Sequence, residues 1–184
     1  MSSVCPWYLG YFLINPLRFL IHRPSKILAP HVKPGFVAFE PGAGMGFFTI
    51  ELARRVGAEG RVHVVDIQPH MLKVLARRAA KAGVGARIDA RLAKGDSLGV
   101  EDLAGRVDFV LAFAVVHEMP DIARFFAETS TALKKGGRML LAEPRGHVKD
   151  AMFAAELKAA AENCMRAVEH PTIRGGLAAV LEKG

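Results

Sequence analysis

The feature that most constrains the fold of this chain is a glycine-rich turn placed between an apolar run and a helix-like segment. Residues 36–39 are apolar, residues 46–56 have a helical pattern, and between them the sequence reads Glu40-Pro41-Gly42-Ala43-Gly44-Met45-Gly46. Three glycines in such a turn let the backbone pass very close to a ligand. A turn of this kind after a strand is typical of nucleotide and nucleoside sites at the carboxyl end of a sheet.

The rest of the sequence alternates between short apolar runs and helix-like stretches. Predicted strands span residues 36–39, 61–65, 87–92, 107–116, 138–142, 165–173 and 177–181, and predicted helices span residues 46–56, 69–82, 121–133 and 148–163. Strands that alternate with helices of about 10 to 15 residues indicate βαβ units and a mainly parallel sheet. We therefore predict an α/β sandwich with helices on both faces of the sheet.

Length and composition favour one globular domain with a short appendage. The chain has 184 residues, of which 51% are hydrophobic and 23% charged, and it has two widely separated cysteines. A domain averages roughly 150 residues, and so few cysteines argue against a disulfide scaffold. We assign residues 34–184 to the main domain and residues 1–33 to an N-terminal helical extension.

An acidic residue at the end of the second predicted strand adds to the glycine turn. Asp66 follows the turn by about 20 residues, where a carboxylate can take two ribose hydroxyls. The glycines are spaced G-x-G-x-G, with Phe47 where a dinucleotide fingerprint has its third glycine, and Glu40 would repel a pyrophosphate. These residues favour a nucleoside that carries positive charge over a nicotinamide dinucleotide, and an oxidoreductase stays the less favoured alternative.

Five segments together resemble the class I S-adenosylmethionine-dependent methyltransferases. The resemblance covers residues 34–184 and implies a seven-stranded sheet of order 3-2-1-4-5-7-6 with strand 7 antiparallel. It would put strand 6 at an edge, where Pro171 costs no hydrogen bond of the sheet. The segments that carry it are the glycine turn, Val64-Val65-Asp66-Ile67, Lys94-Gly95-Asp96-Ser97-Leu98, Arg106-Val107-Asp108-Phe109-Val110-Leu111-Ala112-Phe113 and Leu133-Lys134-Lys135-Gly136-Gly137-Arg138-Met139-Leu140.

The resemblance implies S-adenosyl-L-methionine as the cofactor and a set of residues that hold it. Asp66 would bind the ribose, Ile67 would lie against the adenine, and Asp96 would contact the adenine amino group. A structural alternative stays open for two of them, since Asp66 could cap the following helix and Asp96 with Ser97 could form a turn. The full predicted set is Glu40, Pro41, Gly42, Ala43, Gly44, Asp66, Ile67, Gly95, Asp96, Ser97 and Phe113.

His117 is the candidate catalytic residue. It follows the fourth predicted strand together with Glu118, in a loop that borders the methyl donor in the family, and its pKa near neutrality suits a general base. A structural histidine that orders the loop is the alternative. Glu143 and His147 are expected to face the same cleft, but no pair has metal-ligand spacing, so we predict no metal.

The N-terminal segment holds the single Trp and both Tyr of the chain. In the resembling family such a segment often forms a lid over the donor and shapes the acceptor pocket. A helix packed on the sheet edge, a membrane-surface helix and a homodimer contact are the alternatives, because Trp7, Phe12 and Phe19 are costly to expose.

The net charge of +7 is spread over predicted helix surfaces, which favours a solvated face over nucleic-acid binding. The most apolar stretch, residues 7–21, contains Asn15, Pro16 and Arg18, so we expect no stable membrane insertion and a cytoplasmic location. We predict methyl transfer to a small-molecule acceptor. A quinone or lipid methyltransferase at the membrane surface and a non-catalytic S-adenosylmethionine-binding module are the alternatives.

Overall fold

The computed structural model describes residues 21–93 and 97–184, and these two stretches form two compact units. The strands are β1 (Val37–Pro41), β2 (Arg61–Asp66), β3 (Ile88–Leu92), β4 (Val107–Phe113), β5 (Leu133–Pro144), β6 (Met165–Glu169) and β7 (Gly176–Lys183). The helices are α3 (Pro24–Leu28), α4 (Thr49–Arg55), α5 (Pro69–Lys81), α6 (Ile122–Ala132) and α7 (Asp150–Glu162), with short 3-10 turns η2 (Gly85–Arg87), η3 (Glu101–Leu103) and η4 (Val116–Glu118).

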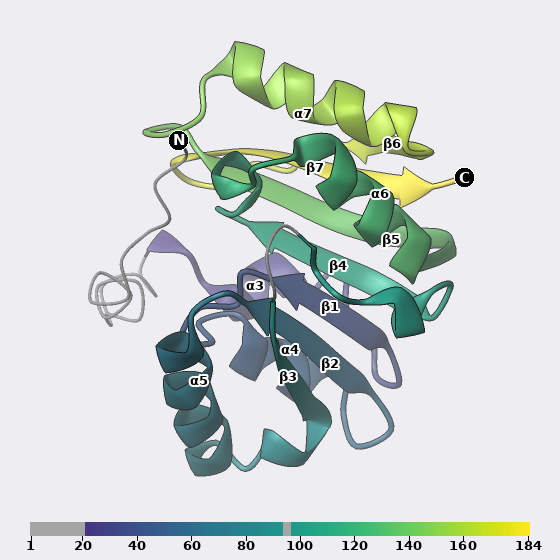
Figure 1. Ribbon diagram of the computed structural model, residues 1–184. Coiled ribbons are helices and arrows are strands. Elements are labelled where there is room, and N and C mark those ends of the chain that lie inside the picture. Colours follow the sequence, from purple (N-terminus) through teal and green to yellow (C-terminus); the bar gives the residue numbers. More distant parts are fainter. Residues whose placement is uncertain (1–20, 94–96) are drawn as a thin grey trace. The chain divides into compact units, whose positions relative to one another are not determined.

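The strand order is β3-β2-β1-β4-β5-β7-β6 (Figure 1). β2 runs parallel to β1 and β3, and β5 runs parallel to β4, whereas β7 is antiparallel to both β5 and β6. The predicted order, the antiparallel seventh strand and the α/β class are therefore confirmed.

In the unit of residues 21–93, the helices pack on the strands through apolar stripes. Met71, Leu75 and Ala79 of α5 are spaced by four residues and are all buried, so this helix turns one face to β2 and β3. Pro69 starts α5, where its fixed φ and missing N–H cost nothing. α4 packs on β2, and α3 packs on α4.

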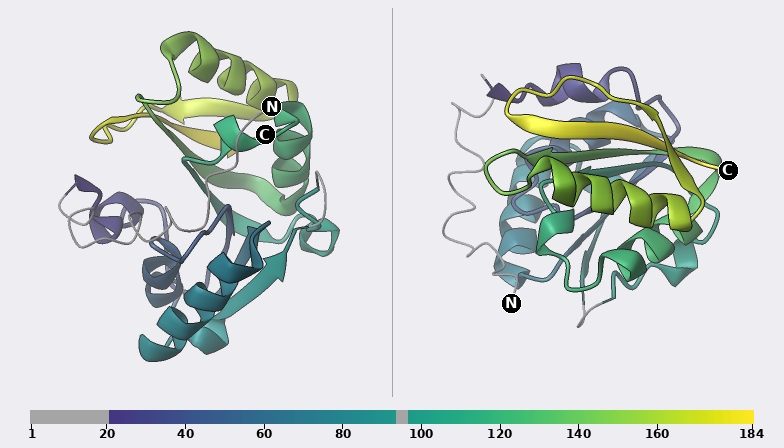
Figure 2. Two further views of the ribbon diagram at one scale, coloured as in Figure 1. Left: turned by 60° about the vertical axis from the view of Figure 1, so that its left-hand side comes forward. Right: turned by 90° about the horizontal axis from the view of Figure 1, so that it is seen from above.

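In the unit of residues 97–184, α6 and α7 pack against each other and against the strands (Figure 1). Asp121 precedes α6 and its carboxylate accepts the backbone N–H of Arg124 at 2.9 Å, which caps the helix. β7 lies between β5 and β6, so the β6–β7 hairpin, yellow in Figure 2, forms the outer edge of this unit.

Two element boundaries near the glycine turn differ from prediction. β1 continues to Pro41, and α4 begins at Thr49 instead of at residue 46. Gly42, Gly44 and Gly46 have φ values of +67°, +54° and +78°, so the backbone stays outside the right-handed helical region until the turn is complete. The prediction that a helix starts within the turn is wrong.

Three further element boundaries, in the unit of residues 97–184, differ from prediction. The fourth strand ends at Phe113 and not at residue 116, because Ala114 has a φ of +55° and η4 follows. β5 begins at Leu133, five residues before the predicted start, directly after α6. β6 ends at Glu169, so Pro171 lies beyond the edge strand instead of within it.

Candidate functional site

Backbone hydrogen bonds join the glycine turn to the end of β2 and close the turn on itself. Gly42 donates its N–H to the carbonyl of Val65 at 2.8 Å, and Gly46 donates to the carbonyl of Ala43 at 3.0 Å. A Cβ added at Gly44 would meet no heavy atom within 4 Å, whereas one at Gly46 would lie 3.0 Å from Leu75 Cγ. Gly44 therefore faces open space, and Gly46 serves close packing against α5.

Asp66 ties the glycine turn to the start of α5. One carboxylate oxygen accepts the N–H of Gly44 at 2.9 Å, and the other accepts the N–H of Gln68 at 2.8 Å. The side chain is buried, and this burial raises the pKa of Asp66, while the backbone hydrogen bonds pull the pKa back down. Ile67, the next residue, is 48% exposed and offers an apolar surface beside the carboxylate.

Glu40 is buried just before the turn. Its Oε2 accepts the hydroxyl of Thr49 at 2.6 Å, which joins the end of β1 to the first residue of α4. Pro41 and Ala43 are buried as well, and Gly42 is exposed. The turn thus exposes glycine backbone above a buried carboxylate.

The loop after β3 is held by a residue that the sequence reasoning missed. Glu128 of α6 accepts the hydroxyl of Ser97 at 3.0 Å and the N–H of Leu98 at 2.7 Å. Ser97 also accepts the N–H of Gly99 at 3.1 Å, so its hydroxyl shapes a local turn. The predicted adenine contacts Gly95 and Asp96 lie outside the described residues.

A buried carboxylate organises the turn after β4. Glu143, at 1% exposure, accepts the backbone N–H groups of Val115 and Val116 at 3.3 and 2.8 Å through Oε1. Its Oε2 accepts Nδ1–H of His117 at 2.5 Å. The positive φ of Ala114 precedes these contacts directly, so Glu143 holds a backbone conformation that a non-glycine residue rarely adopts.

His117 is oriented by this contact. The hydrogen bond that His117 donates to Glu143 is the main cause that raises the pKa of His117 above 6.5, and burial acts in the opposite direction. The His147 ring lies 5.5 Å from the His117 ring between centroids, and Phe113 is half-buried at the end of β4. Glu143 and His147 thus both lie against the His117 ring, and that they face one cleft stays a prediction.

Glu156 of α7 joins this cluster, and the sequence reasoning missed it. Its side chain is 1% exposed, and its Oε2 has no hydrogen-bond partner within residues 21–93 and 97–184. Burial and the negative charge of Glu143 raise the pKa of Glu156 to about 8, while His117 lowers it. The available signal was its position between Phe153 and Ala160 on the buried stripe of α7, where an apolar side chain is the rule.

A family model described as a methyltransferase domain matches residues 33–183. The chain belongs to the class I S-adenosylmethionine-dependent methyltransferases. This confirms the resemblance drawn from the five segments. Within the described part of this methyltransferase domain, no group of three or more His, Cys, Asp or Glu side chains is arranged to hold a metal ion.

The domain is 34% identical over 136 residues to the ribosomal protein L11 methyltransferase of Pelotomaculum thermopropionicum, covering 72% of this chain and 41% of that protein. It is 29% identical over 116 residues to the ubiquinone/menaquinone biosynthesis C-methyltransferase of Brucella anthropi, covering 63% of this chain and 43% of that protein. The chain thus spans less than half the length of either relative. The crystal structure of a SAM-dependent methyltransferase from Aquifex aeolicus superposes with a TM-score of 0.83 at 18% identity, covering 97% of this chain and all of that one, which shows the shared fold.

Proposed function

We propose that this chain transfers the methyl group of S-adenosyl-L-methionine to a small-molecule acceptor. The observation that carries the proposal is the Asp66-held glycine turn, in which Gly44 faces open space. The turn exposes glycine backbone where a ligand can approach closely, and a carboxylate able to take ribose hydroxyls lies beside it. Exposed Ile67 supplies an apolar surface for the adenine.

The residues proposed to hold the donor fall into two groups. The glycine turn and the end of β2 would hold the amino-acid end, the ribose and one side of the adenine, and the second group would complete the contacts to the adenine. When bound, the donor supplies a methyl group that its sulfonium has already activated. The first group is Glu40, Pro41, Gly42, Ala43, Gly44, Asp66 and Ile67, and the second is Gly95, Asp96, Ser97 and Phe113.

His117 is proposed as the general base that takes a proton from the acceptor. Glu143 fixes the ring through Nδ1, so the Nε2 lone pair of the neutral imidazole is available to an acceptor hydroxyl or amine. A carboxylate on Nδ1 also stabilises the imidazolium that forms when Nε2 takes the proton. Activity is then expected to rise with pH as His117 loses its resting proton, above the ordinary range for histidine because its pKa is raised.

One alternative acceptor has support from a specific relative. The Brucella anthropi protein is a ubiquinone/menaquinone methyltransferase, and residues 7–21 of this chain are strongly apolar. A lipid or quinone acceptor at a membrane surface would predict co-sedimentation with liposomes, which a water-borne small acceptor does not require. Among the described residues, no helix combines the length and hydropathy needed to cross a bilayer.

Calorimetric titration with S-adenosyl-L-homocysteine tests the donor half of the proposal. Saturable binding is expected for the wild-type chain, and no binding at about 1 mM would overturn it. Tight binding with no turnover on any acceptor would favour the non-catalytic module instead. For the base, His117→Gln should lower kcat while leaving the affinity for the donor product unchanged, and an unchanged kcat would assign His117 a structural role.

A further inference from the structure

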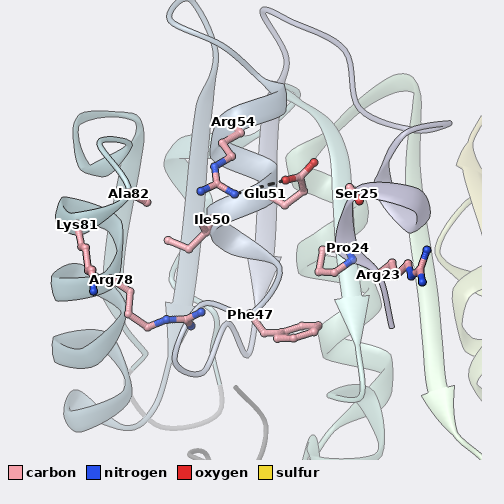
Figure 3. A pocket seen from close by; sticks show the side chains of 10 residues that line it. All are labelled: Arg23, Pro24, Ser25, Phe47, Ile50, Glu51, Arg54, Arg78, Lys81 and Ala82. Atoms are coloured by element: carbon pink, nitrogen blue, oxygen red, sulfur yellow. Dashed lines mark ion pairs between the residues drawn. The ribbon is translucent and has the colours of Figure 1, made fainter. Parts of the chain in front are cut away.

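A concave surface lies among α3, α4 and α5 in the unit of residues 21–93. The groove has a volume of about 650 Å³ and is bounded by the start of α3, by α4 and by the second half of α5 (Figure 3). That volume is in the range of sites for small organic ligands. None of the residues proposed to hold the methyl donor lines it.

The groove carries a strong excess of positive charge. Four of its lining side chains are cationic and one is acidic, and they are Arg23, Arg54, Arg78, Lys81 and Glu51. Glu51 forms an ion pair with Arg55 at 2.9 Å and a longer one with Arg54 at 3.9 Å. Within the described part of the chain, no carboxylate forms an ion pair with the other three cations. Like charges gathered in a concave surface raise the local potential and favour an anion.

Arg78 is the most enclosed of these cations. Its Nη1 donates to the carbonyl of Met45 in the glycine turn, and burial lowers the pKa of its guanidinium. Figure 3 shows the Arg78 side chain extending from α5 toward Phe47, and the Arg54 side chain lying on α4 beside Glu51, with Ile50 between the two arginines. A guanidinium has five N–H donors in a planar fork that matches phosphate oxygens, so Arg78 keeps donors for a ligand after its contact with Met45.

The groove also has an apolar wall. Phe47, Ile50 and Pro24 line it beside the cations. A ligand that fits both parts has a flat apolar body and a doubly charged anionic group. Residues 1–20 contain no Asp or Glu, so that segment of the chain brings no carboxylate side chain to neutralise the groove.

We propose that this groove binds a phosphorylated small molecule, with its phosphate on Arg78, Arg54 and Lys81 and its ring on Phe47 and Ile50. The cations of the groove repel the sulfonium of the methyl donor, whereas they attract a phosphate. The inference does not depend on the proposed methyl transfer, since anion binding can be measured without a donor or an acceptor.

Phenyl phosphate is the probe. Inorganic phosphate tests its anionic group alone, and phenol tests its aromatic ring alone. Calorimetry at low salt is expected to show saturable binding of phenyl phosphate, weaker binding of inorganic phosphate and no binding of phenol. Arg78→Gln and Lys81→Gln should each weaken the binding of phenyl phosphate by about fivefold or more, because each removes a charge-assisted contact. Lys81 is exposed at the end of α5, so Lys81→Gln tests the site even where Arg78→Gln disturbs the glycine turn.

Arg77→Gln is the matched control, since Arg77 is an exposed arginine on the same helix but does not line the groove. It should change the dissociation constant by less than about twofold, the effect of net charge alone. The proposal is overturned if Arg77→Gln weakens binding as much as Lys81→Gln does, if phenol binds as well as phenyl phosphate, or if phenyl phosphate does not bind at about 10 mM.

Discussion

Glu156 gives the chain a pH dependence of stability that a single amide should remove. Its carboxyl is buried and its pKa is raised from 4.5 to about 8. Between these two values the folded state holds a proton that the unfolded state has lost, so the free energy of unfolding falls as pH rises. One pH unit costs about 1.4 kcal/mol, so raising the pH by about two units within this window costs about 3 kcal/mol.

Glu156→Gln should therefore become more stable than the wild type as pH rises. Glutamine matches the neutral carboxyl in size, so the lead of the variant in free energy of unfolding should grow by about 3 kcal/mol between about pH 5.5 and about pH 7.5. Urea unfolding at the two pH values measures this difference. The comparison cancels the contribution of every other titrating group to the pH dependence of stability, apart from the groups coupled to Glu156, namely Glu143 and His117.

Glu162→Gln is the control on the same helix, because Glu162 is exposed and pairs only loosely with Lys158 at 3.8 Å. Its stability should follow the wild type at both pH values. Parallel wild-type and Glu156→Gln curves between the two pH values would refute the reasoning, since they would show that Glu156 ionises in the folded chain as it does in the unfolded one.

Three further predictions concern the donor turn, the histidine and the packing. Asp66→Ala should weaken the binding of S-adenosyl-L-homocysteine by about tenfold or more in calorimetry, and unchanged affinity would remove Asp66 from the donor site. Glu143→Gln should bring the pKa of His117 back toward 6.5 in an NMR titration, and an unmoved pKa would contradict the assigned cause. Gly60→Ala, whose Cβ would lie 2.4 Å from a valine Cβ, should lower the free energy of unfolding by about 2 kcal/mol or more, whereas Gly146→Ala, with open space around it, should change it little.

Much of the fold was predictable because its signals are local. Periodicity and the Pro–Gly boundaries located α5 within one residue at its end, and they located β2 equally well. The errors fall where long-range contacts decide the backbone. β5 starts at Leu133 because that residue pairs with Val107 of β4, and no local signal in the sequence reveals this pairing.

The candidate site was predictable only in part, for the same reason. The spacing of Asp66 to the glycine turn predicted it as a site residue, and Glu143 was expected to face the same cleft as His117. Glu128 and Glu156 were missed because their roles come from contacts made by helices distant in sequence: Glu128 binds a loop 30 residues away, and Glu156 lies on a stripe that reads as apolar.

Asp66 and Glu143 have one physical role in common. Each stands at or near the carboxyl end of a strand, and each accepts backbone N–H from a turn with positive φ, at Gly44 for Asp66 and after Ala114 for Glu143. A buried carboxylate is stable only when such donors satisfy it, and a positive φ at a non-glycine residue such as Ala114 persists only when neighbouring contacts hold it. The acid and the turn therefore stabilise each other before any ligand binds. The ligand then meets a turn whose conformational entropy has already been lost on folding, so less of its binding energy goes into ordering the protein.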